Sequence, residues 1–345
     1  MHSCLKRIFA QPLIQAPMVG VSTPQMAAAV SNAGGLGSLG IGASPVAAAQ
    51  DMIEETRGRT SAAFNVNVFC HPPPQRDSAV EAEWLEYLAP IFHEFGFTPP
   101  AALKEIYKSF VEDEEAFRML LIMRPKIVSF HFGLPPQDRI NAMRDAGILT
   151  MATATNVDEV RLIEAAGIDV VVAQGVEAGG HRGQFALSER DLGLSLSVLI
   201  RLAVRSTRLP VIAAGGIMDV QGVRAALALG AAAVQMGTAF VLCPESAADS
   251  TYRAALKSER AIDTRLTSAI SGRPARGIAN RFMEIGAMGP PVPSYPVAYD
   301  VGKRLHTVTR AKGCDAFGAY WAGQGAALAR EMPAAKLVAD ILRQI

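Results

Sequence analysis

A glycine-rich segment at residues 173–183, AQGVEAGGHRG, contains the clearest candidate for acid–base chemistry. Its four glycines allow the backbone to approach a planar ligand closely, and His181 stands among them. Because an imidazole titrates near neutral pH, we predict that His181 is a catalytic residue. Gln174, at the end of the preceding apolar run, is expected to hydrogen-bond the edge of the ligand. Glu177 and Arg182 have a simpler interpretation, as solvated charges of the loop.

Two other segments place glycines where a phosphate can bind. One apolar run ends in Gly215 and Gly216, and the next ends in QMGT at residues 235–238. Glycine lets backbone N–H groups reach a phosphate, and a helix that starts beyond the turn adds a favourable dipole. For either segment alone, a plain tight turn explains the glycines equally well. The occurrence of both, at successive strand ends, favours a phosphate site.

Two polar side chains close earlier apolar runs. Asn67 lies in NVNVF at residues 65–69, and His131 lies in SFHF at residues 129–132. Both are expected to point toward the same site. For His131 there is a competing interpretation of nearly equal weight, a buried histidine that is hydrogen-bonded to a carbonyl group.

Tyr295, Tyr299 and Lys303 recur at every fourth residue near the end of the chain. A helix opened by Pro296 would place all three on one face, where two phenols and an ammonium group can hold a small anion. From the spacing alone, an amphipathic surface helix is the better interpretation. The segment YWAGQG at residues 320–325 adds aromatic groups beside glycines that can close over a ligand.

These segments follow a regular alternation of short apolar runs and longer helical patterns, which is typical of a parallel sheet built from βαβ units. Eight such units favour an α/β fold with a closed (β/α)8 TIM barrel, in which function resides on the loops after the strands and phosphate binds after strands seven and eight. Predicted helix caps are Thr23, Ser44 and Asn156. The predicted strands cover residues 13–18, 35–41, 63–69, 127–132, 148–152, 170–173, 211–214 and 232–236, and the predicted helices cover residues 24–33, 45–57, 137–146, 157–166, 194–205 and 220–229.

Two regions do not fit a bare barrel. Residues 71–124 carry acidic amphipathic patterns at 78–95 and 101–123, and predict a helical insertion near the barrel mouth. Residues 263–345 are rich in Gly, Pro, Ser and Tyr before a final helix at 333–345, and predict a C-terminal lid segment and terminal helix. The barrel itself is then expected to comprise residues 1–70 and 125–262.

Composition excludes several classes of protein. The 33 basic and 32 acidic residues of the 345 give a net charge of +1, so we expect neither nucleic acid nor an anionic membrane as a partner. Four scattered cysteines without a CxxC pair predict no metal cluster and fit a reducing compartment, and the N-terminus lacks the apolar core of a secretory signal, so a cytoplasmic location is expected. The apolar residues 225–242 are interrupted by Gly230 and Gln235, and are predicted to be a helix end, a turn and a buried strand rather than a membrane span.

Taken together, the motifs resemble the nitronate monooxygenases, formerly called 2-nitropropane dioxygenases, and specifically their bacterial class I. The resemblance covers most of the chain and includes QAPMVGVSTPQMAAAVSNAGGLGSLG at residues 15–40, the segments at 173–183 and 210–219, ALALGAAAVQMGTAF at 226–240 and YWAGQGA at 320–326. The tyrosine and lysine spacing together with His131 points to class I. One departure is Gly325, where the family usually has a serine after the glutamine.

The resemblance implies FMN as the cofactor and the oxidation of alkyl nitronates, propionate 3-nitronate foremost, by dioxygen. The products would be a carbonyl compound and nitrite, formed through one-electron transfer to the flavin. His181 would act as the base when a neutral nitroalkane is the substrate, or otherwise orient the nitronate, with His131, Tyr299 and Lys303 as candidate partners of the nitro oxygens. We expect FMN to be bound by Ala16, Pro17, Met18, Asn67, Gln174, Gly179, Gly180, Gly215, Gly216, Gln235, Met236, Gly237, Thr238, Tyr320 and Gln324.

Three alternatives stay open at this point. An NAD(P)H-dependent FMN reductase, of the quinone or enoyl-acyl-carrier-protein type, shares the barrel motifs, and the tyrosine and lysine set is the feature that distinguishes it. A flavin-binding protein without turnover would not need His181. A metabolic barrel without flavin would use the glycine turns for a substrate phosphate. Whether the chain is a monomer or a homodimer is left open.

Overall fold

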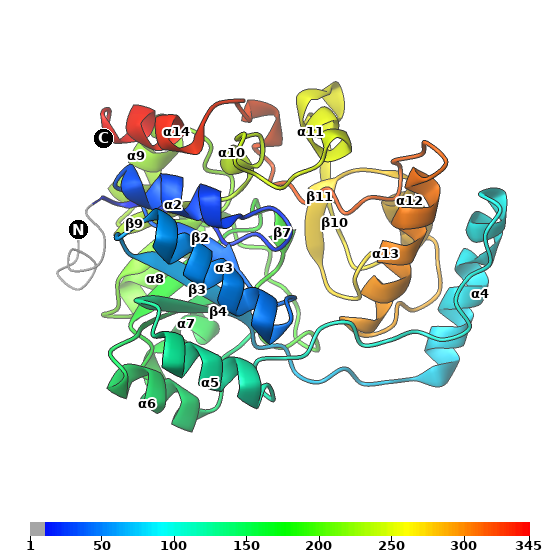
Figure 1. Ribbon diagram of the computed structural model, residues 1–345, viewed down its shortest axis with the longest axis horizontal. Helices are drawn as coiled ribbons and strands as arrows, with labels where there is room; N and C mark the ends of the chain where they lie inside the picture. Colours follow the sequence, from blue (N-terminus) through cyan, green and yellow to red (C-terminus); the bar gives the residue numbers. More distant parts are fainter. Residues whose placement is uncertain (1–10) are drawn as a thin grey trace.

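Eight parallel strands form a closed barrel in the computed structural model, which describes residues 11–345 (Figure 1). Cys4 and the N-terminal segment that bears on secretion lie outside the described residues. The strands follow the order β1-β9-β8-β6-β5-β4-β3-β2, and a parallel bridge between Ile14 and Leu36 joins the two ends of this row. The predicted TIM barrel is therefore confirmed.

Each barrel strand coincides with one of the eight apolar runs. β5 continues two residues beyond its run and β6 one residue beyond, whereas β1 stops at Gln15. Side chains on both faces of the strands are buried because helices cover the outside of the barrel. The strands are β1 Leu13–Gln15, β2 Gly37–Gly40, β3 Phe64–Phe69, β4 Ile127–His131, β5 Leu149–Ala154, β6 Val170–Gln174, β8 Val211–Ala214 and β9 Ala233–Met236.

The helices around the barrel begin and end largely where their caps predict. Thr23 accepts a hydrogen bond from Met26 N, and Asn156 accepts one from Glu159 N. The start of α3 differs from the prediction, because Pro45 rather than Ser44 occupies the N-cap position and no side chain caps the helix. The helices are α2 Pro24–Asn32, α3 Val46–Arg59, α5 Glu114–Met123, α6 Gln137–Asp145, α7 Val157–Ala165, α8 Leu196–Ser206, α9 Val220–Ala228, α10 Thr238–Val241, α11 Ser250–Lys257 and α14 Ala334–Leu342.

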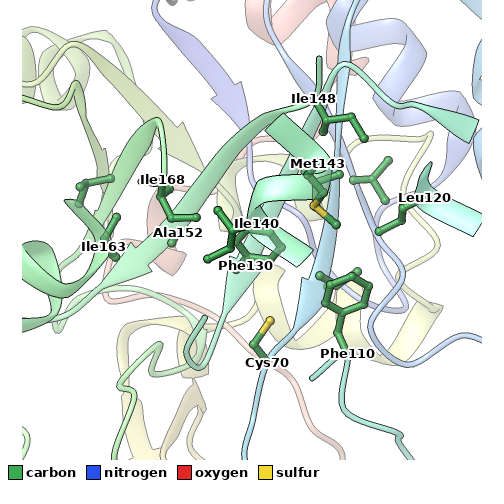
Figure 2. Packing of buried hydrophobic residues seen from close by; sticks show 14 of the residues in the cluster. Cys70, Phe110, Leu120, Phe130, Ile140, Met143, Ile148, Ala152, Ile163 and Ile168 are labelled. Carbon is green, nitrogen blue, oxygen red and sulfur yellow. The ribbon is translucent and has the colours of Figure 1, made fainter. Parts of the chain in front are cut away.

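The larger core lies between the strands and these helices. Phe130 of β4 faces Ile140 and Met143 of α6, and Phe110 and Leu120 extend the same cluster toward α5 (Figure 2). Burial of such side chains is the main stabilising contribution that fixes the strands, and hence the residues at their ends.

A second lobe stands beside the barrel and has its own hydrophobic core (Figure 1). It consists of α4 Ser78–Glu94, α12 Arg281–Ala287 and α13 Val297–Arg310, with the strands β10 Thr264–Thr267 and β11 Ala275–Ile278. We call these five elements the cap lobe. Trp84 and Leu88 of α4 share this core with Phe282 and Val301, so the insertion and the C-terminal segment pack together.

One connection between the barrel and the cap lobe was not predicted from the sequence. Gly180–His181 form a short strand, β7, which pairs antiparallel with β11, so that Ala275 lies opposite His181. The glycine-rich segment is thus held in a three-stranded sheet with β11 and β10. Its conformation depends on residues almost a hundred positions later in the chain.

Two predicted helices are shorter than expected. Of residues 101–123, only Glu114–Met123 are helical, because the preceding segment is bound to other parts of the molecule: Asp300 accepts a hydrogen bond from Lys104 N, and Phe69 O accepts one from Phe110 N. The terminal helix α14 begins after Pro333 and packs on α2 at the barrel wall (Figure 1). It therefore does not cover the carboxyl ends of the strands.

Residues 225–242 form the end of α9, a turn at Gly230 and β9, as predicted, and then α10, which was not predicted. Within residues 11–345, no helix combines the length and the apolar character needed to cross a membrane.

Candidate functional site

A cavity of about 440 Å³ opens at the carboxyl ends of the barrel strands, and the cap lobe closes its other side. This volume lies within the range of sites for small molecules and cofactors, and the position is the one at which barrels carry function. The predicted site residues that line the cavity are Ala16, Pro17, Met18, Asn67, His131, Gln174, Gly179, Gly180, His181, Gly215, Gly216, Gln235, Gly237, Thr238, Tyr295, Tyr299, Lys303 and Tyr320.

Two residues predicted to bind the cofactor do not line the cavity. Met236 alternates with Gln235 along β9, so its side chain is buried in the core between the strands and the helices. The Gln324 side chain is exposed to solvent, and only the backbone of this residue takes part locally, where its N–H donates to Glu177 O.

The glycines after β8 have the backbone geometry that a cradle for a bound group requires. Gly215 and Gly216 have φ angles of +133° and +66°, which L residues with a side chain rarely adopt. The helix that follows, α9, is already capped, because Asp219 Oδ1 accepts a hydrogen bond from Gly222 N. A phosphate here would therefore interact with the backbone of the turn rather than with the first turn of the helix.

The glycines of the 173–183 segment serve two different purposes. A Cβ on Gly179 would lie 2.5 Å from Gly323 N, so this glycine is required where the segment packs against the C-terminal region. Gly180 has a φ of +73° and no neighbouring atom within 4 Å of its Cβ position, so it leaves free space beside the cavity. After β9, Thr238 Oγ1 accepts from Gly323 N and keeps its own hydrogen available for a ligand.

His181 lies at the centre of an aromatic cage at the cavity wall. Its ring centroid lies 5.3 Å from that of Trp321, 5.4 Å from Tyr295 and 5.6 Å from Phe132. Burial, and after it the charges of His131 and Arg273, lower the pKa of His181 to about 3. The imidazole is therefore neutral near pH 7 and is able to accept a proton.

His131 uses both of its ring nitrogens within the protein. Its Nε2 lies 3.2 Å from the carbonyl oxygen of His181 and its Nδ1 lies 3.0 Å from Thr153 Oγ1. Since a carbonyl oxygen only accepts, Nε2 carries the hydrogen and Nδ1 accepts from the threonine. Burial lowers the pKa of His131 to about 4. These contacts match the competing interpretation of this residue, although its ring also lines the cavity.

The charged residues of the glycine-rich segment are not the solvated charges that were one interpretation of the sequence. Arg182 is fully buried, forms an ion pair of 2.7 Å with Asp191 and donates to the carbonyl oxygen of Gln174. Glu177 accepts from Leu196 N at 2.9 Å, at the start of α8. Both side chains act as anchors for the segment, since each forms hydrogen bonds to backbone groups that the loop conformation would otherwise leave unpaired.

The predicted anion-binding set is brought together in the cavity. Tyr299 and Lys303 lie on α13, whereas Tyr295 precedes the helix. The hydroxyl of Tyr295 is buried and has no hydrogen-bond partner among the described residues. Burial raises the pKa values of Tyr295 and Tyr299, so both phenols remain protonated donors. Lys303 Nζ lies 5.3 Å from the ring centre of Tyr299, and burial lowers the pKa of this lysine.

Sequence reasoning missed several residues of the site. Tyr107 lines the cavity, and Lys303 Nζ lies 4.9 Å from its ring centre. Phe132, with a φ of +75°, places its ring between His131 and His181. Arg273 is buried with its guanidinium 4.2 Å from the ring centre of Phe132. Tyr107 lies in a segment predicted to be helical, Phe132 belongs to SFHF only as an apolar neighbour of His131, and Arg273 belongs to no motif, so the sequence assigned none of them to the site.

Comparisons with known proteins identify the family of the chain. The family model "Nitronate monooxygenase" matches residues 2–344. The chain is 56% identical over 337 residues to a nitronate monooxygenase of Pseudomonas aeruginosa, covering 97% of this chain and 96% of the relative. It is 55% identical over 337 residues to a nitronate monooxygenase of Paraburkholderia phytofirmans, covering 97% of this chain and 92% of the relative.

Solved structures show the same similarity. A nitroalkane oxidase from Streptomyces ansochromogenes matches with a TM-score of 0.89 and 38% identity, over 99% of this chain and 97% of that one. FabK from Thermotoga maritima matches with a TM-score of 0.73 and 28% identity, over 100% of this chain and 96% of that one. On the match of the family model and the identity to these relatives, the chain belongs to the nitronate monooxygenase family.

Proposed function

We propose that this protein is an FMN-dependent nitronate monooxygenase, which oxidises alkyl nitronates with dioxygen to a carbonyl compound and nitrite. The observation that carries the proposal is the combination, in one cavity, of a neutral histidine with an ammonium group and protonated phenols. This set accommodates a small organic anion beside a base. We assign the oxidation of nitronates as the reaction because the chain belongs to the nitronate monooxygenase family.

The cavity fits FMN, and several of its residues would hold it. The glycine turns after β8 and β9 offer backbone N–H groups and the hydroxyl of Thr238 to a phosphate, as the left-handed Gly216 indicates. Gln174 and Asn67 lie at strand ends and line the same cavity, where they would contact the ring system. When bound, FMN would be the electron acceptor in the oxidation of the nitronate. Gly180 leaves open the space that a planar group needs.

Lys303 and the tyrosines bind and orient the substrate in this proposal. The side chain of Tyr295 lines the cavity, and its enclosed hydroxyl has no partner among residues 11–345, so a small rotation toward the substrate would let it donate to an anionic oxygen. Lys303 offers a positive charge at the cavity wall, which suits the carboxylate of propionate 3-nitronate as a second anionic group. We therefore take propionate 3-nitronate as the best substrate.

His181 acts according to the charge of the substrate. A nitronate is already deprotonated, so the imidazole has only to orient it. A neutral nitroalkane must first lose a proton from the carbon that bears the nitro group, and the neutral imidazole of His181 is placed to accept it. We assign His131 the role of positioning His181 through its backbone carbonyl.

The cap lobe and the segment that carries Tyr107 together form the lid of the site in this proposal. They contribute Tyr107, Tyr295, Tyr299 and Lys303 to the cavity wall. Aromatic groups exclude water around the reacting carbon, which strengthens electrostatic interactions there. We place the enzyme in the cytoplasm, with a small-molecule nitronate and dioxygen as its reactants.

The test is a comparison of two reactions of the purified protein. Oxygen uptake and nitrite release are followed with propionate 3-nitronate, and NADH oxidation is followed with a quinone as acceptor. Rapid nitronate turnover without NADH oxidation is the expected result. Rapid NADH oxidation with an inert nitronate would overturn the proposal and assign the protein to the FMN reductases, the class suggested by the alternative interpretation of the barrel motifs.

A further inference from the structure

A buried serine links the catalytic histidine to the backbone of the cap lobe. Ser271, between β10 and β11, has no exposed surface. Its Oγ lies 2.9 Å from His181 Nε2 and 3.1 Å from the carbonyl oxygen of Arg273. The hydroxyl therefore lies between an imidazole nitrogen and a backbone acceptor.

The direction of these two hydrogen bonds follows from the number of hydrogens available. A carbonyl oxygen only accepts, so Ser271 donates its one hydrogen to Arg273 O. No other described residue donates to this carbonyl. The opposite orientation, in which the serine donates to His181, would leave a buried carbonyl group unpaired. Ser271 Oγ must then accept from His181, and His181 Nε2 carries the ring hydrogen.

The other ring nitrogen is left as the proton acceptor. His181 Nδ1 has no hydrogen-bond partner among the described residues, and it is not among the buried polar atoms enclosed by protein. Because the ring lines the cavity, the free lone pair on Nδ1 faces the space in which substrate binds. A neutral imidazole has one protonated and one unprotonated nitrogen. Because the hydrogen is fixed on Nε2, the nitrogen that accepts a proton is Nδ1.

The surroundings of the ring keep this arrangement neutral. The buried guanidinium of Arg273 lies over the ring of Phe132, which in turn packs edge-on against His181. The remaining titratable side chains around the ring are His131, His71, Tyr295 and Tyr299. None of them is a carboxylate that would stabilise an imidazolium before the substrate proton arrives.

We propose that Ser271 is a positioning residue that holds His181 in the Nε2–H tautomer, so that Nδ1 takes the proton from a neutral nitroalkane. This inference rests on the proposed function. In the step, the C–H bond beside the nitro group breaks and its electron pair remains on the substrate, which becomes the nitronate. The proton forms the new Nδ1–H bond, and Nε2–H continues to donate to Ser271.

The tautomer is measured directly, without turnover. Histidine labelled with ¹⁵N is incorporated into the FMN-loaded protein, and proton–nitrogen correlation spectra identify which ring nitrogen of each of the six histidines is protonated. The signals that His181→Asn removes belong to His181. We expect Nε2 to be protonated and Nδ1 to be unprotonated at pH 7.5. A protonated Nδ1 in the wild-type protein would overturn the proposal.

The variant Ser271→Ala tests the consequence for catalysis. It should keep bound FMN, show both tautomers of His181 and lower turnover of neutral nitroethane by at least about tenfold, because most of the population then presents the wrong nitrogen. Turnover of the preformed nitronate should change by less than about threefold, since this substrate needs no base. An equal loss with both substrates, or an unchanged tautomer, would overturn the proposal.

Ser31→Ala is the matched control. Ser31 is also buried and also donates to a backbone carbonyl, that of Ala63, but it lies on α2 outside the cavity. This variant should leave the ratio of the two turnover rates unchanged. If the wild-type protein released nitrite from neither substrate, the proposed function would fail, while the spectra would still report the tautomer of His181.

Discussion

The imidazole of His131 donates from Nε2 to the backbone carbonyl oxygen of His181 over 3.2 Å. The Gln174 side chain donates to the same oxygen at 3.0 Å, so two side chains from different strands fix one peptide group. This peptide group orients the imidazole of His181, and the catalytic residue is thereby positioned through its main chain as well as through its ring.

Replacement of His131 by phenylalanine should impair both reactions to a similar degree. The variant loses one of the two donors to His181 O and keeps the other, so we expect the imidazole to shift and turnover to fall by about tenfold with nitroethane and with the nitronate alike. Steady-state kinetics with both substrates checks this. A loss confined to nitroethane would instead identify His131 as the base.

Replacement of His181 by asparagine should lower turnover of nitroethane far more than turnover of the preformed nitronate. Without the imidazole, proton abstraction from nitroethane loses its base, and turnover should fall by about 10²- to 10⁴-fold. The preformed nitronate needs no base and loses only the group that orients it, so its turnover should fall by about tenfold, as in His131→Phe. The protein should remain yellow, because His181 is not part of the glycine turns. Normal oxidation of nitroethane by this variant would refute the assignment of the base.

Replacement of Gly216 by valine should abolish FMN binding. The residue has a φ of +66°, and a Cβ there would lie 3.2 Å from Glu177 Cβ, so the turn must change its shape. Absorbance of the purified variant at visible wavelengths measures the bound cofactor. Gly147→Val is the control, because Gly147 has a similar φ of +74° after α6, away from the cavity. Each variant should lose about 1–3 kcal/mol of stability, but only the first should be colourless.

Replacement of Lys303 by methionine should weaken binding of propionate 3-nitronate selectively. Removal of the positive charge should raise KM for this doubly anionic substrate by about tenfold, equivalent to one interaction of roughly 1.4 kcal/mol. The KM for propyl 2-nitronate, which lacks the carboxylate, should rise less. Lys312→Met is the control, since Lys312 also lies over an aromatic ring, that of Phe97, but does not line the cavity. Equal effects on both substrates would show that Lys303 does not recognise the carboxylate.

The stability of the protein should fall on mild acidification, in part because of His71. Its side chain is 1% exposed, and burial followed by the charge of Arg273 lowers its pKa to about 4. In the unfolded chain the pKa is about 6.5, so near pH 5 the unfolded state takes up a proton that the folded state does not. The cost is about 2 kcal/mol of unfolding free energy at pH 5 relative to pH 7.5, and it is regained as the pH rises.

The variant His71→Phe tests this account. It keeps an aromatic ring against Tyr295 and removes the titrating group, so urea unfolding at pH 5 and pH 7.5 should differ by about 2 kcal/mol less than in the wild type. His93→Phe, on the exposed surface of α4, should show the wild-type pH dependence. An unchanged difference in His71→Phe would mean that this histidine is protonated equally in the folded and unfolded states.

The barrel was predictable because its evidence is local. Caps such as Asn156 and glycines such as Gly230 mark helix ends within a few residues, and apolar runs mark each strand. The glycine turns and His181 could be found in the same way, since motif and position coincide at the strand ends. That they lie together in one cavity follows from the barrel.

The remainder of the site depends on contacts between distant segments. Tyr107 reaches the cavity because Asp300 and Phe69 bind the backbone of its segment in place of a helix. From the sequence, Arg182 is interpreted as a solvated charge in a loop. In the structure it is buried, because it forms an ion pair with Asp191 and donates hydrogen bonds to backbone carbonyl groups. A strand of two residues such as β7 is too short to show alternation of apolar and polar residues. Its pairing with β11 therefore cannot be predicted from the sequence.

That pairing has a consequence for the synthesis of the protein. Every strand of the barrel has been made once the ribosome has added Met236, but Ala275, which lies opposite His181, follows 39 residues later. Ser271 and Trp321, which contact the imidazole, also come after the last barrel strand. A nascent chain can therefore complete the barrel before it can hold its catalytic histidine, and activity arises only when the last quarter of the polypeptide has folded onto the barrel.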